Sequence, residues 1–293
     1  MNRTRVTAPG RVTSVCAWVC AAVLAVTLAG CTHRTSVQFA PGSTMDRIHQ
    51  AGKIIVGVKF DQPGEGFRNL ATGQLEGFDI EMAKIVAARL GLEPSQINYV
   101  ETVSKEREDA ITSGRVDIVI ATYSITPERS KKVGQAGPYF VTGQRILVRK
   151  EDQDRITGPD KLAGVRVCSV AGSTSITTVQ ATYGARPVGL ATYTECVKLL
   201  LSRSADAVDA VTTDDAILSV YAAQQPDRLS VVGQPFTEER YGIGYMKGDL
   251  AFCRFLTDTI IEAESDGEWT RAFTRTLGKV GVSIPERPVP APC

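Results

Sequence analysis

The chain has 293 residues, with 33 Lys and Arg against 32 Asp and Glu, so its net charge is close to zero. This balance gives no indication of a nucleic-acid-binding surface, which needs clustered positive charge. The only histidines are His33 and His49, so the body of the chain lacks an imidazole base for a Ser-His-Asp or Cys-His site and lacks a His-rich zinc site. We therefore expect no metal or cofactor. Carboxylates and lysines can also serve as catalytic bases, so the lack of histidine argues against an enzyme without excluding one.

The N-terminal segment predicts export. Three arginines within residues 3–11 precede an apolar run over residues 15–29, and the run ends in Leu28-Ala29-Gly30-Cys31. This order is typical of a secretory signal. Small residues before a cysteine resemble a bacterial lipobox, so we expect residues 1–31 to be a lipoprotein signal peptide, with Cys31 lipidated and held in the membrane. A plain anchor helix is the alternative, but the run is shorter than the ~20 residues that a span needs.

Residues 32–44 are polar and lack apolar periodicity, which predicts a tether. An ordered edge strand is the alternative. The remaining part, roughly 250 residues, is at the upper limit for one hydrophobic core, so we expect one large domain or two lobes.

Four cysteines remain after the signal segment: Cys168, Cys196, Cys253 and Cys293. An even number in an exported chain favours disulfides over free thiols, although four buried thiols are the alternative. Three pairings are possible, and proximity in the chain favours Cys168 with Cys196 and Cys253 with Cys293. The spacing contains no CxxC pair, so we do not expect a metal site.

Short apolar strands alternate with helical patterns along the body of the chain. The expected strands span residues 53–58, 97–100, 116–120, 165–170, 187–190, 208–212 and 229–232. The expected helices span residues 78–90, 107–112, 193–202 and 214–223, one begins at Pro127, one follows 171–175 and ends near 183, and two lie within 249–277. This alternation predicts an α/β fold with largely parallel sheets.

Ligands of such folds lie at the carboxyl ends of strands, beside helix N-termini. Polar clusters follow four of the expected strands: Lys59 and Asp61; Thr122, Ser124 and Arg129; Ser173, Thr174 and Ser175; and Thr212, Thr213 and Asp214. Taken singly, several of these residues are plausible helix caps. Together they supply hydroxyls, one guanidinium and two carboxylates, which suits a zwitterionic ligand.

Several motifs occur in one order and spacing along the body. They include IIVGVKFD at 54–61, LEGFDIEMA at 75–83, GRVD at 114–117, ATYSITPER at 121–129, GPYF at 137–140, DKLAGVRV at 160–167, GST at 172–174 and YGIG at 241–244. Over about Met45 to Leu277 the chain resembles the polar-amino-acid solute-binding proteins of ABC transporters (family 3 solute-binding proteins). The KFDQPG segment is most similar to the glutamate- and glutamine-binding lipoproteins of actinobacteria.

The resemblance implies two Rossmann-like lobes joined by two hinge strands, the type II periplasmic-binding-protein fold. The chain would cross between lobes near 148–151 and return near 236–240. The first lobe would then comprise residues 45–148 plus 241–284 and the second lobe residues 149–240. The tail 285–293 would pack on the first lobe if Cys293 bonds Cys253.

The resemblance also implies roles for individual residues at the ligand's α-carbon. Arg129 would hold the α-carboxylate in a bidentate pair, and Ser124 would bind the carboxylate or the amino group. The carbonyl of Thr122 would accept a hydrogen bond from the α-ammonium, although many relatives have Gly there. Asp214 would pair with the α-ammonium from the second lobe.

Five further residues would contact the rest of the ligand. Ser173 and Thr174 would donate to carboxylates from a helix N-terminus, and Phe78 would cover the ligand's carbon chain unless it is ordinary core. Lys59 and Asp61 are two apart on a strand, so their side chains leave on the same face. Asp61 aligns with a family ligand position, which would place Lys59 against a distal carboxylate, unless Lys59 merely pairs with Asp61 or faces solvent.

We therefore expect a monomeric, lipid-anchored binding protein at the cell membrane. It would capture a free amino acid outside the cytoplasm and deliver it to an ABC permease. Glutamate or aspartate is favoured, with glutamine or asparagine as the alternative. A sensor read by a membrane signalling receptor would need the same cleft. A periplasmic dehydratase-like enzyme is a further alternative, with Asp61, Asp214 and Lys59 as its available acids and bases.

Overall fold

The computed structural model describes residues 1, 2, 4, 5 and 38–293. The expected signal segment, including Cys31, and residues 32–37 of the expected tether lie outside the described residues, apart from the first few positions. The folded body comprises Gln38–Cys293. Within the described part of the chain, no helix combines the length and the apolar character that crossing a membrane requires.

The expected tether is too long at its C-terminal end. The ring of Phe39 packs edge-on against the rings of His49 and Phe255, with centroids 5.8 Å apart in both pairs. Ser43 then caps helix α1 (Thr44–Ala51) by accepting a hydrogen bond from the amide of Asp46. The chain therefore joins the folded body at Gln38, because the aromatic ring of Phe39 packs against that body.

The first of two large sheets has the strand order β5-β1-β6-β13-β7. Its strands are β1 (Ile54–Val58), β5 (Ile97–Glu101), β6 (Ile118–Val119), β7 (Gly134–Thr142) and β13 (Glu239–Tyr245). Strands β5, β1 and β6 are parallel, whereas β13 is antiparallel to both β6 and β7. Strand β1 is buried along most of its length, as expected for a parallel strand covered on both faces.

The second sheet has the strand order β10-β9-β11-β8-β12. Its strands are β8 (Gln144–Arg149), β9 (Arg166–Val170), β10 (Arg186–Leu190), β11 (Ala210–Asp214) and β12 (Leu229–Val232). Strands β10, β9 and β11 are parallel, and β8 is antiparallel to β11 and β12.

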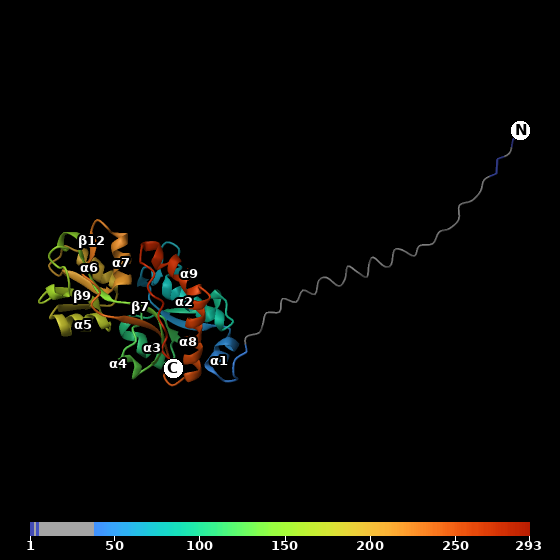
Figure 1. Ribbon diagram of the computed structural model, residues 1–293, viewed down its shortest axis with the longest axis horizontal. Helices are drawn as coiled ribbons and strands as arrows, with labels where there is room; N and C mark the ends of the chain where they lie inside the picture. The colour runs from blue at the N-terminus through green and yellow to red at the C-terminus, as the bar shows by residue number, and fades with distance from the viewer. Residues whose placement is uncertain (3, 6–37) are drawn as a thin grey trace. The chain divides into compact units, whose positions relative to one another are not determined.

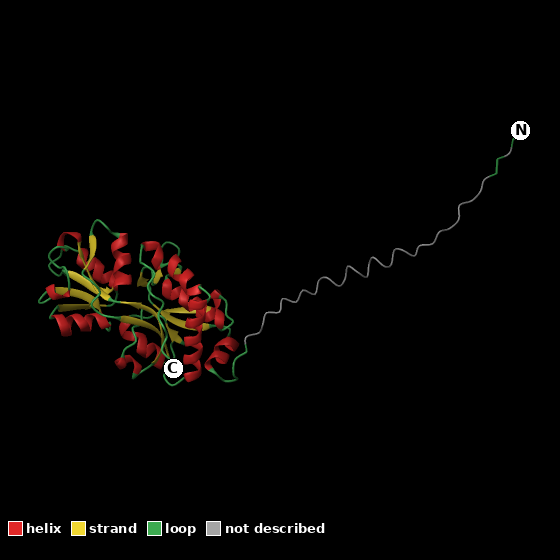
Figure 2. Cartoon of the chain, in the orientation of Figure 1, coloured by secondary structure: helices red, strands yellow, loops and turns green. Residues whose placement is uncertain are grey.

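Helices cover both faces of each sheet (Figures 1 and 2). The helices beside the first sheet are α2 (Phe78–Arg89), α3 (Arg107–Thr112), α4 (Pro127–Ser130), α8 (Leu250–Ser265) and α9 (Glu268–Arg275). The helices beside the second sheet are α5 (Thr174–Tyr183), α6 (Tyr193–Leu201) and α7 (Asp215–Gln224). Separate apolar clusters fill the opposite faces of each sheet. The α/β fold that the alternating pattern predicted is confirmed, and it has the two sheet-centred lobes that the family resemblance implied.

The first crossing between the sheets comes earlier than expected. Strand β7 ends at Thr142 in the first sheet, and β8 begins at Gln144 in the second. The crossing therefore falls at Gly143, and the assignment of residues up to Val148 to the first lobe is wrong. The reason is that the apolar segment of β8 pairs with β11 and β12, so the charged residues after it mark the end of a strand, not a hinge.

The chain returns to the first sheet between Val232 and Glu239. We call residues 38–142 and 239–293 the first lobe and residues 144–232 the second lobe. The tail after residue 285 lies against the first lobe, where the amide of Ala291 donates to the carbonyl of Gly137 at 2.8 Å.

A small antiparallel sheet, which the sequence pattern did not predict, follows β1. It consists of β2 (Asp61–Gln62), β3 (Gly66–Arg68) and β4 (Leu75–Glu76). Gly77 then begins α2 at φ 128°, and a Cβ atom there would lie 2.1 Å from the carbonyl oxygen of Glu65. Glycine is required at this position because the turn between β2 and β3 packs directly on the start of the helix.

Both disulfides favoured by chain proximity are present. Cys168 in β9 bonds Cys196 in α6, and Cys253 in α8 bonds Cys293 in the tail. Each bond lies within one lobe, so neither restrains movement of one lobe against the other.

The structure places Phe78 in the aromatic core, so its expected role over the ligand is wrong. Its side chain is fully buried, and its ring packs against Trp269, Phe140 and Phe273 at centroid distances of 5.5, 5.6 and 5.8 Å. Phe78 is the first residue of α2, and this places the ring beneath the helix, away from the edge of the sheet.

Substitution of Phe78 should therefore reduce the stability of the fold without removing a ligand contact. We expect Phe78→Ala to lower the free energy of unfolding by about 3–5 kcal/mol, because it leaves a large cavity in the core. Urea denaturation followed by circular dichroism measures this change. Leu70→Ala, at a side chain that is 91% exposed, is the control and should leave the midpoint unchanged. A loss below 1 kcal/mol in Phe78→Ala would contradict the packing.

Candidate ligand-binding site

A polar cavity lies where the strand ends of the two lobes meet. It is narrow, and the space between its walls that no atom fills is about 250 Å³, part of which is open to solvent. The residues that line it are Ser104, Arg107, Thr122, Ser124, Arg129, Ser173, Thr174, Ser175, Tyr193, Thr213, Asp214 and Ile217. Most of them follow the carboxyl end of a strand: β5 and β6 in the first lobe, and β9, β10 and β11 in the second. This is the edge at which open α/β sheets bind ligands.

Arg129 reaches the cavity from the short helix α4, which begins at Pro127 after the cap residue Thr126. Its side chain is 9% exposed. One Nη donates to the carbonyl of Ser124 at 2.7 Å, and the other donates across the cleft to the carbonyl of Gly172 at 3.2 Å. The structure therefore brings Arg129 and Ser124 together, as expected, and Arg129 also bridges the two lobes.

Arg107 is a second buried cation at the same wall. It is 2% exposed and lies in the first turn of α3. Its Nη1 donates to the carbonyls of Ala121 and Thr122 at 3.1 and 3.2 Å, and its guanidinium lies 4.4 Å from the centroid of the Tyr123 ring. Burial and the nearby charge of Arg129 lower the pKa of Arg107 to about 10, so the group stays charged at neutral pH.

Thr122 takes up an unusual backbone conformation, with φ 44°. Its amide donates to a carboxylate oxygen of Asp79 at 2.9 Å, and its hydroxyl bonds Oε1 of Gln62 at 3.0 Å. These contacts hold the residue in a region that β-branched residues rarely adopt. Its side chain and carbonyl face the cavity region, but the carbonyl accepts from Arg107.

Asp214 ends β11 and is 4% exposed. Its Oδ2 accepts a hydrogen bond from the hydroxyl of Tyr241 at 2.5 Å, whereas its Oδ1 is buried and has no partner among the described residues. Burial and then the neighbouring charge of Glu239 raise the pKa of Asp214 to about 7. An oxygen that is buried, unpaired and on the cavity wall is suited to receive a cationic group.

The N-terminus of α5 forms part of the second-lobe wall. Ser173 caps the helix through its hydroxyl, which accepts from the amide of Ile176 at 3.1 Å. The hydroxyl of Thr174 donates to Glu239 at 3.0 Å. Both residues line the cavity as expected, together with Ser175, and the positive end of the helix dipole faces the cavity with them.

Two predicted ligand residues, Lys59 and Asp61, do not line the cavity. Lys59 is 2% exposed and lies one layer behind the wall, where its Nζ donates to Oγ of Ser104 at 2.9 Å. Burial and the charge of Arg107 lower the pKa of Lys59 well below its ordinary value. Asp61 turns to the second lobe, where its Oδ2 accepts from the amide of Tyr193 at 2.8 Å. Strand β1 ends at Val58 and Asp61 belongs to β2, so alternation along one strand did not give the directions of these two side chains.

Four lining residues were missed in the sequence: Ser104, Arg107, Tyr193 and Ile217. A signal for three of them was present. Ser104 and Arg107 follow the strand β5, and Tyr193 follows β10, so the strand-end rule applied to every parallel strand would have found them. Ile217 lies inside α7, where its apolar side chain is indistinguishable from core.

Two further buried carboxyl groups lie behind the first-lobe wall. Asp79 accepts from the hydroxyl of Tyr139 at 2.5 Å, and burial raises its pKa to about 6. Glu65 is fully buried, and neither carboxyl oxygen has a partner among the described residues. Burial, Asp79 and Asp214 raise the pKa of Glu65 well above its ordinary value. The described residues contain no group of three or more side chains suited to a metal ion.

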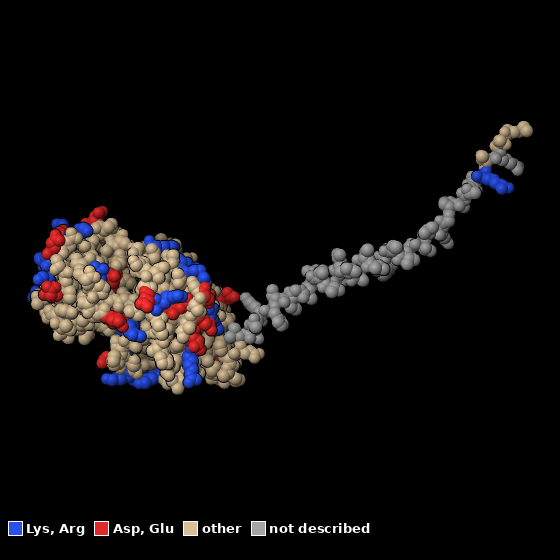
Figure 3. Space-filling model, in the orientation of Figure 1, with Lys and Arg blue, Asp and Glu red and all other residues tan. Residues whose placement is uncertain are grey.

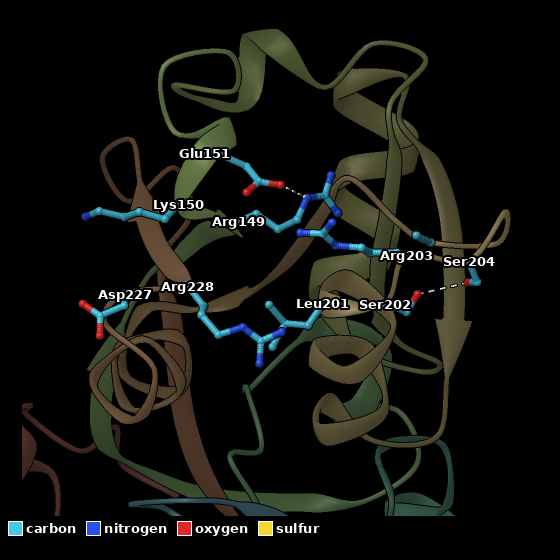
Figure 4. A pocket seen from close by; sticks show the side chains of 10 residues that line it. Arg149, Lys150, Glu151, Leu201, Ser202, Arg203, Ser204, Asp227 and Arg228 are labelled. Carbon is cyan, nitrogen blue, oxygen red and sulfur yellow. Dashed lines mark hydrogen bonds and ion pairs between the residues drawn. The ribbon is translucent and has the colours of Figure 1, made fainter.

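A larger pocket lies at the opposite end of the second sheet (Figure 4). The labelled side chains Arg149, Lys150 and Arg228 border it, and Arg149 comes at the end of β8 whose start pairs with Asp214. Arg149 is engaged by Asp152 and by two carbonyls, and Arg203 and Arg228 are exposed. Acidic and basic side chains alternate over the face in Figure 3. The enclosed polar cavity between the lobes is therefore the stronger candidate.

The fold and cavity define a two-lobed binding protein that surrounds its ligand. The model of the bacterial extracellular solute-binding proteins, family 3, matches residues 54–279. The chain belongs to this family.

Two relatives are similar in sequence to this chain over most of their length. A glutamate-binding protein, GluB, of Corynebacterium efficiens is 37% identical over 270 residues, which are 88% of this chain and 90% of the relative. A glutamine-binding protein of Geobacillus stearothermophilus is 33% identical and covers 83% of this chain and 97% of its own.

A solved structure shows the same fold. An ancestral amino acid-binding protein, described as a precursor of cyclohexadienyl dehydratase, superposes with a TM-score of 0.73 at 30% identity. The alignment covers 80% of this chain and all of that chain.

The raised pKa of Asp214 predicts a pH-dependent cost in stability. The folded state holds the proton up to about pH 7 and the unfolded state only to about pH 4, so ionisation destabilises the fold as pH rises between them. Asp214→Asn does not titrate, so its unfolding free energy should gain about 3 kcal/mol relative to the wild type between pH 5 and pH 8. Urea denaturation at both pH values measures the gain.

The exposed Asp154 provides the control, since Asp154→Asn should follow the wild type at both pH values. A constant difference between Asp214→Asn and the wild type would contradict the raised pKa.

Proposed function

We propose that this protein captures glutamate or aspartate outside the cytoplasm. The observation that carries the proposal is the charge of the cavity lining, which contains two buried guanidinium groups, Arg107 and Arg129, and one buried carboxyl group, Asp214. Glu108, outside the lining, lies 3.5 Å from Arg129. A ligand with two carboxylates and one ammonium complements this arrangement. Buried charges are tolerated only when they are paired, so the wall favours a ligand of opposite charge pattern.

In the proposed complex, Arg129 binds the α-carboxylate, because its planar fork offers two parallel donors. Ser124 and the N-terminus of α5 border the same part of the cavity. The α-ammonium takes the unpaired Oδ1 of Asp214. The positive charge of the ammonium then favours the ionised form of this carboxyl group, so the carboxyl proton is released to solvent and an ion pair forms.

Arg107 receives the distal carboxylate in this arrangement. Arg107 lines the cavity and takes the role that we expected of Lys59. Lys59 instead supports the wall by donating a hydrogen bond to the hydroxyl of Ser104. The named relatives favour the same ligand class, since one is a glutamate-binding protein and the other a glutamine-binding protein.

Glutamine is the second candidate, together with asparagine. Its side-chain carbonyl oxygen would accept a hydrogen bond from Arg107, but its amide NH₂ would add no negative charge beside two buried cations. The charge balance of the wall therefore favours the acidic ligand.

The proposed cellular role is delivery of the amino acid to an ABC permease by a monomer anchored through lipidated Cys31. A membrane signalling receptor that reads the closed lobes is the alternative partner. The likeness to a dehydratase precursor makes catalysis a separate outcome. Incubation of the purified protein with candidate amino acids, followed by mass spectrometry, distinguishes binding from turnover.

Isothermal titration calorimetry should give tighter binding of glutamate or aspartate than of glutamine. We expect a difference of roughly tenfold or more, about 1.4 kcal/mol. Arg107→Met should remove this difference, because it removes the cation that faces the distal group, and Lys59→Met should narrow it less. Arg115→Met, at an exposed arginine of the first lobe, should preserve it. Equal or tighter binding of glutamine by the wild type would overturn the proposed preference.

Arg129 should matter equally for all ligands that bind. We expect Arg129→Ala to weaken glutamate and glutamine at least tenfold each, because one side of a buried charge-assisted pair is lost. Arg129→Lys should also weaken both, since a point charge does not replace the fork. Near-native affinity of either variant would show that the α-carboxylate lies elsewhere.

A further inference from the structure

Asp61 joins the two lobes at a place that is separate from the cavity. It lies in β2 of the first lobe, and its contacts reach two helices of the second lobe. Its Oδ2 accepts from the amide of Tyr193 at 2.8 Å. Its carbonyl oxygen accepts from the hydroxyls of Tyr221 at 2.6 Å and Thr194 at 3.1 Å. The two hydroxyls are also within hydrogen-bond distance of each other, at 2.9 Å.

The geometry of this contact suits a carboxylate. Tyr193 is the first residue of α6, a helix of nine residues, so its free amide and the helix dipole both favour a negative charge there. Thr192 and Glu195 cap the same helix from within the second lobe. Asp61 therefore adds an acceptor from the opposite lobe to a helix end that is already formed.

The contact surface around Asp61 is tightly packed. A Cβ atom on Gly64, in the turn after β2, would lie 2.9 Å from Cγ2 of Val220 in α7. Tyr221 is the next residue of the same helix and is 5% exposed. The turn thus packs closely against α7 in this arrangement of the lobes, and the hydrogen bonds of Asp61 form in the same arrangement.

The residues Asp61, Thr194 and Tyr221 do not line the cavity. Other contacts between the lobes use cavity residues: Arg129 donates to Gly172, and Tyr241 donates to Asp214. A ligand would compete with or reshape those contacts. Of the four residues at the Asp61 contact, Tyr193 alone also lines the cavity, and it bonds Asp61 through its backbone amide.

We propose that Asp61, Thr194 and Tyr221 form a clasp that sets the closed population of the lobes and so scales the affinity for every ligand by one common factor. The proposal rests on the proposed function, because it needs a ligand that binds the closed form. The measured dissociation constant equals the intrinsic one divided by the fraction of competent protein. Weakening the clasp therefore raises the dissociation constants of glutamate and glutamine equally and leaves their ratio unchanged. In this sense Asp61 is a positioning residue and not a ligand residue.

Tyr221→Phe is the test variant, because it removes one hydroxyl and keeps the ring. Loss of one buried hydrogen bond should raise both dissociation constants about threefold to tenfold. Asp61→Asn, which removes the charge at the helix end, should act in the same direction. Tyr99→Phe is the matched control, because it also removes a buried hydroxyl, and this hydroxyl has no partner among the described residues. It should leave both constants unchanged.

Single-molecule fluorescence energy transfer gives a readout that needs no ligand. Dyes on Leu70→Cys and Arg203→Cys, one exposed position in each lobe, report the closed fraction. Tyr221→Phe should lower that fraction in ligand-free protein, and Tyr99→Phe should not.

Unchanged affinity and an unchanged closed fraction in Tyr221→Phe would overturn the clasp. So would a changed ratio of glutamate to glutamine affinity, since it would place Tyr221 at the ligand. If the wild type binds no amino acid, the proposed function fails, and the closed fraction still decides whether the clasp exists.

Discussion

The site depends on keeping two guanidinium groups charged and buried on one aromatic ring. Arg107 and Arg129 lie 4.4 and 5.0 Å from the ring centroid of Tyr123. The repulsion between them is offset by the ring face and by carbonyl oxygens that accept their N–H groups. The backbone is shaped for this purpose, because the positive φ of Thr122 directs two successive carbonyls to Arg107.

Buried carboxyl groups of both lobes provide negative charge near the two guanidinium groups. Asp79 holds the amide of Thr122, and so it supports the strand end that supports Arg107. Asp214 and Tyr241 join the second lobe to the first beside the returning strand β13. A residue that lines the cavity, Asp214, therefore also connects the lobes.

Much of this arrangement could be predicted from the sequence, because local rules govern it. Periodicity gave the alternating elements, and chain proximity gave both disulfides. The strand-end rule placed Arg129, Ser124, Thr122, Ser173, Thr174 and Asp214 on one cavity wall or the other. Prediction failed where the direction of a side chain depends on tertiary packing. Phe78 packs in an aromatic cluster that includes Trp269, almost two hundred positions away in the chain. Lys59 and Asp61 lie where the chain passes from β1 into a small sheet that has no periodic pattern. The crossing at Gly143 was missed because strand pairing, not composition, decides which sheet β8 joins.

The protonated state of Asp214 has a consequence for the heat of binding. Its pKa of about 7 means that a good part of the protein carries this proton at neutral pH. An arriving ammonium would stabilise the ionised form, so the proton leaves to the buffer as the complex forms. The enthalpy seen in a calorimeter then contains the ionisation heat of whichever buffer receives the proton. Titrations in phosphate and in Tris would therefore differ in heat at equal affinity, and the slope against buffer enthalpy would count the protons that Asp214 gives up.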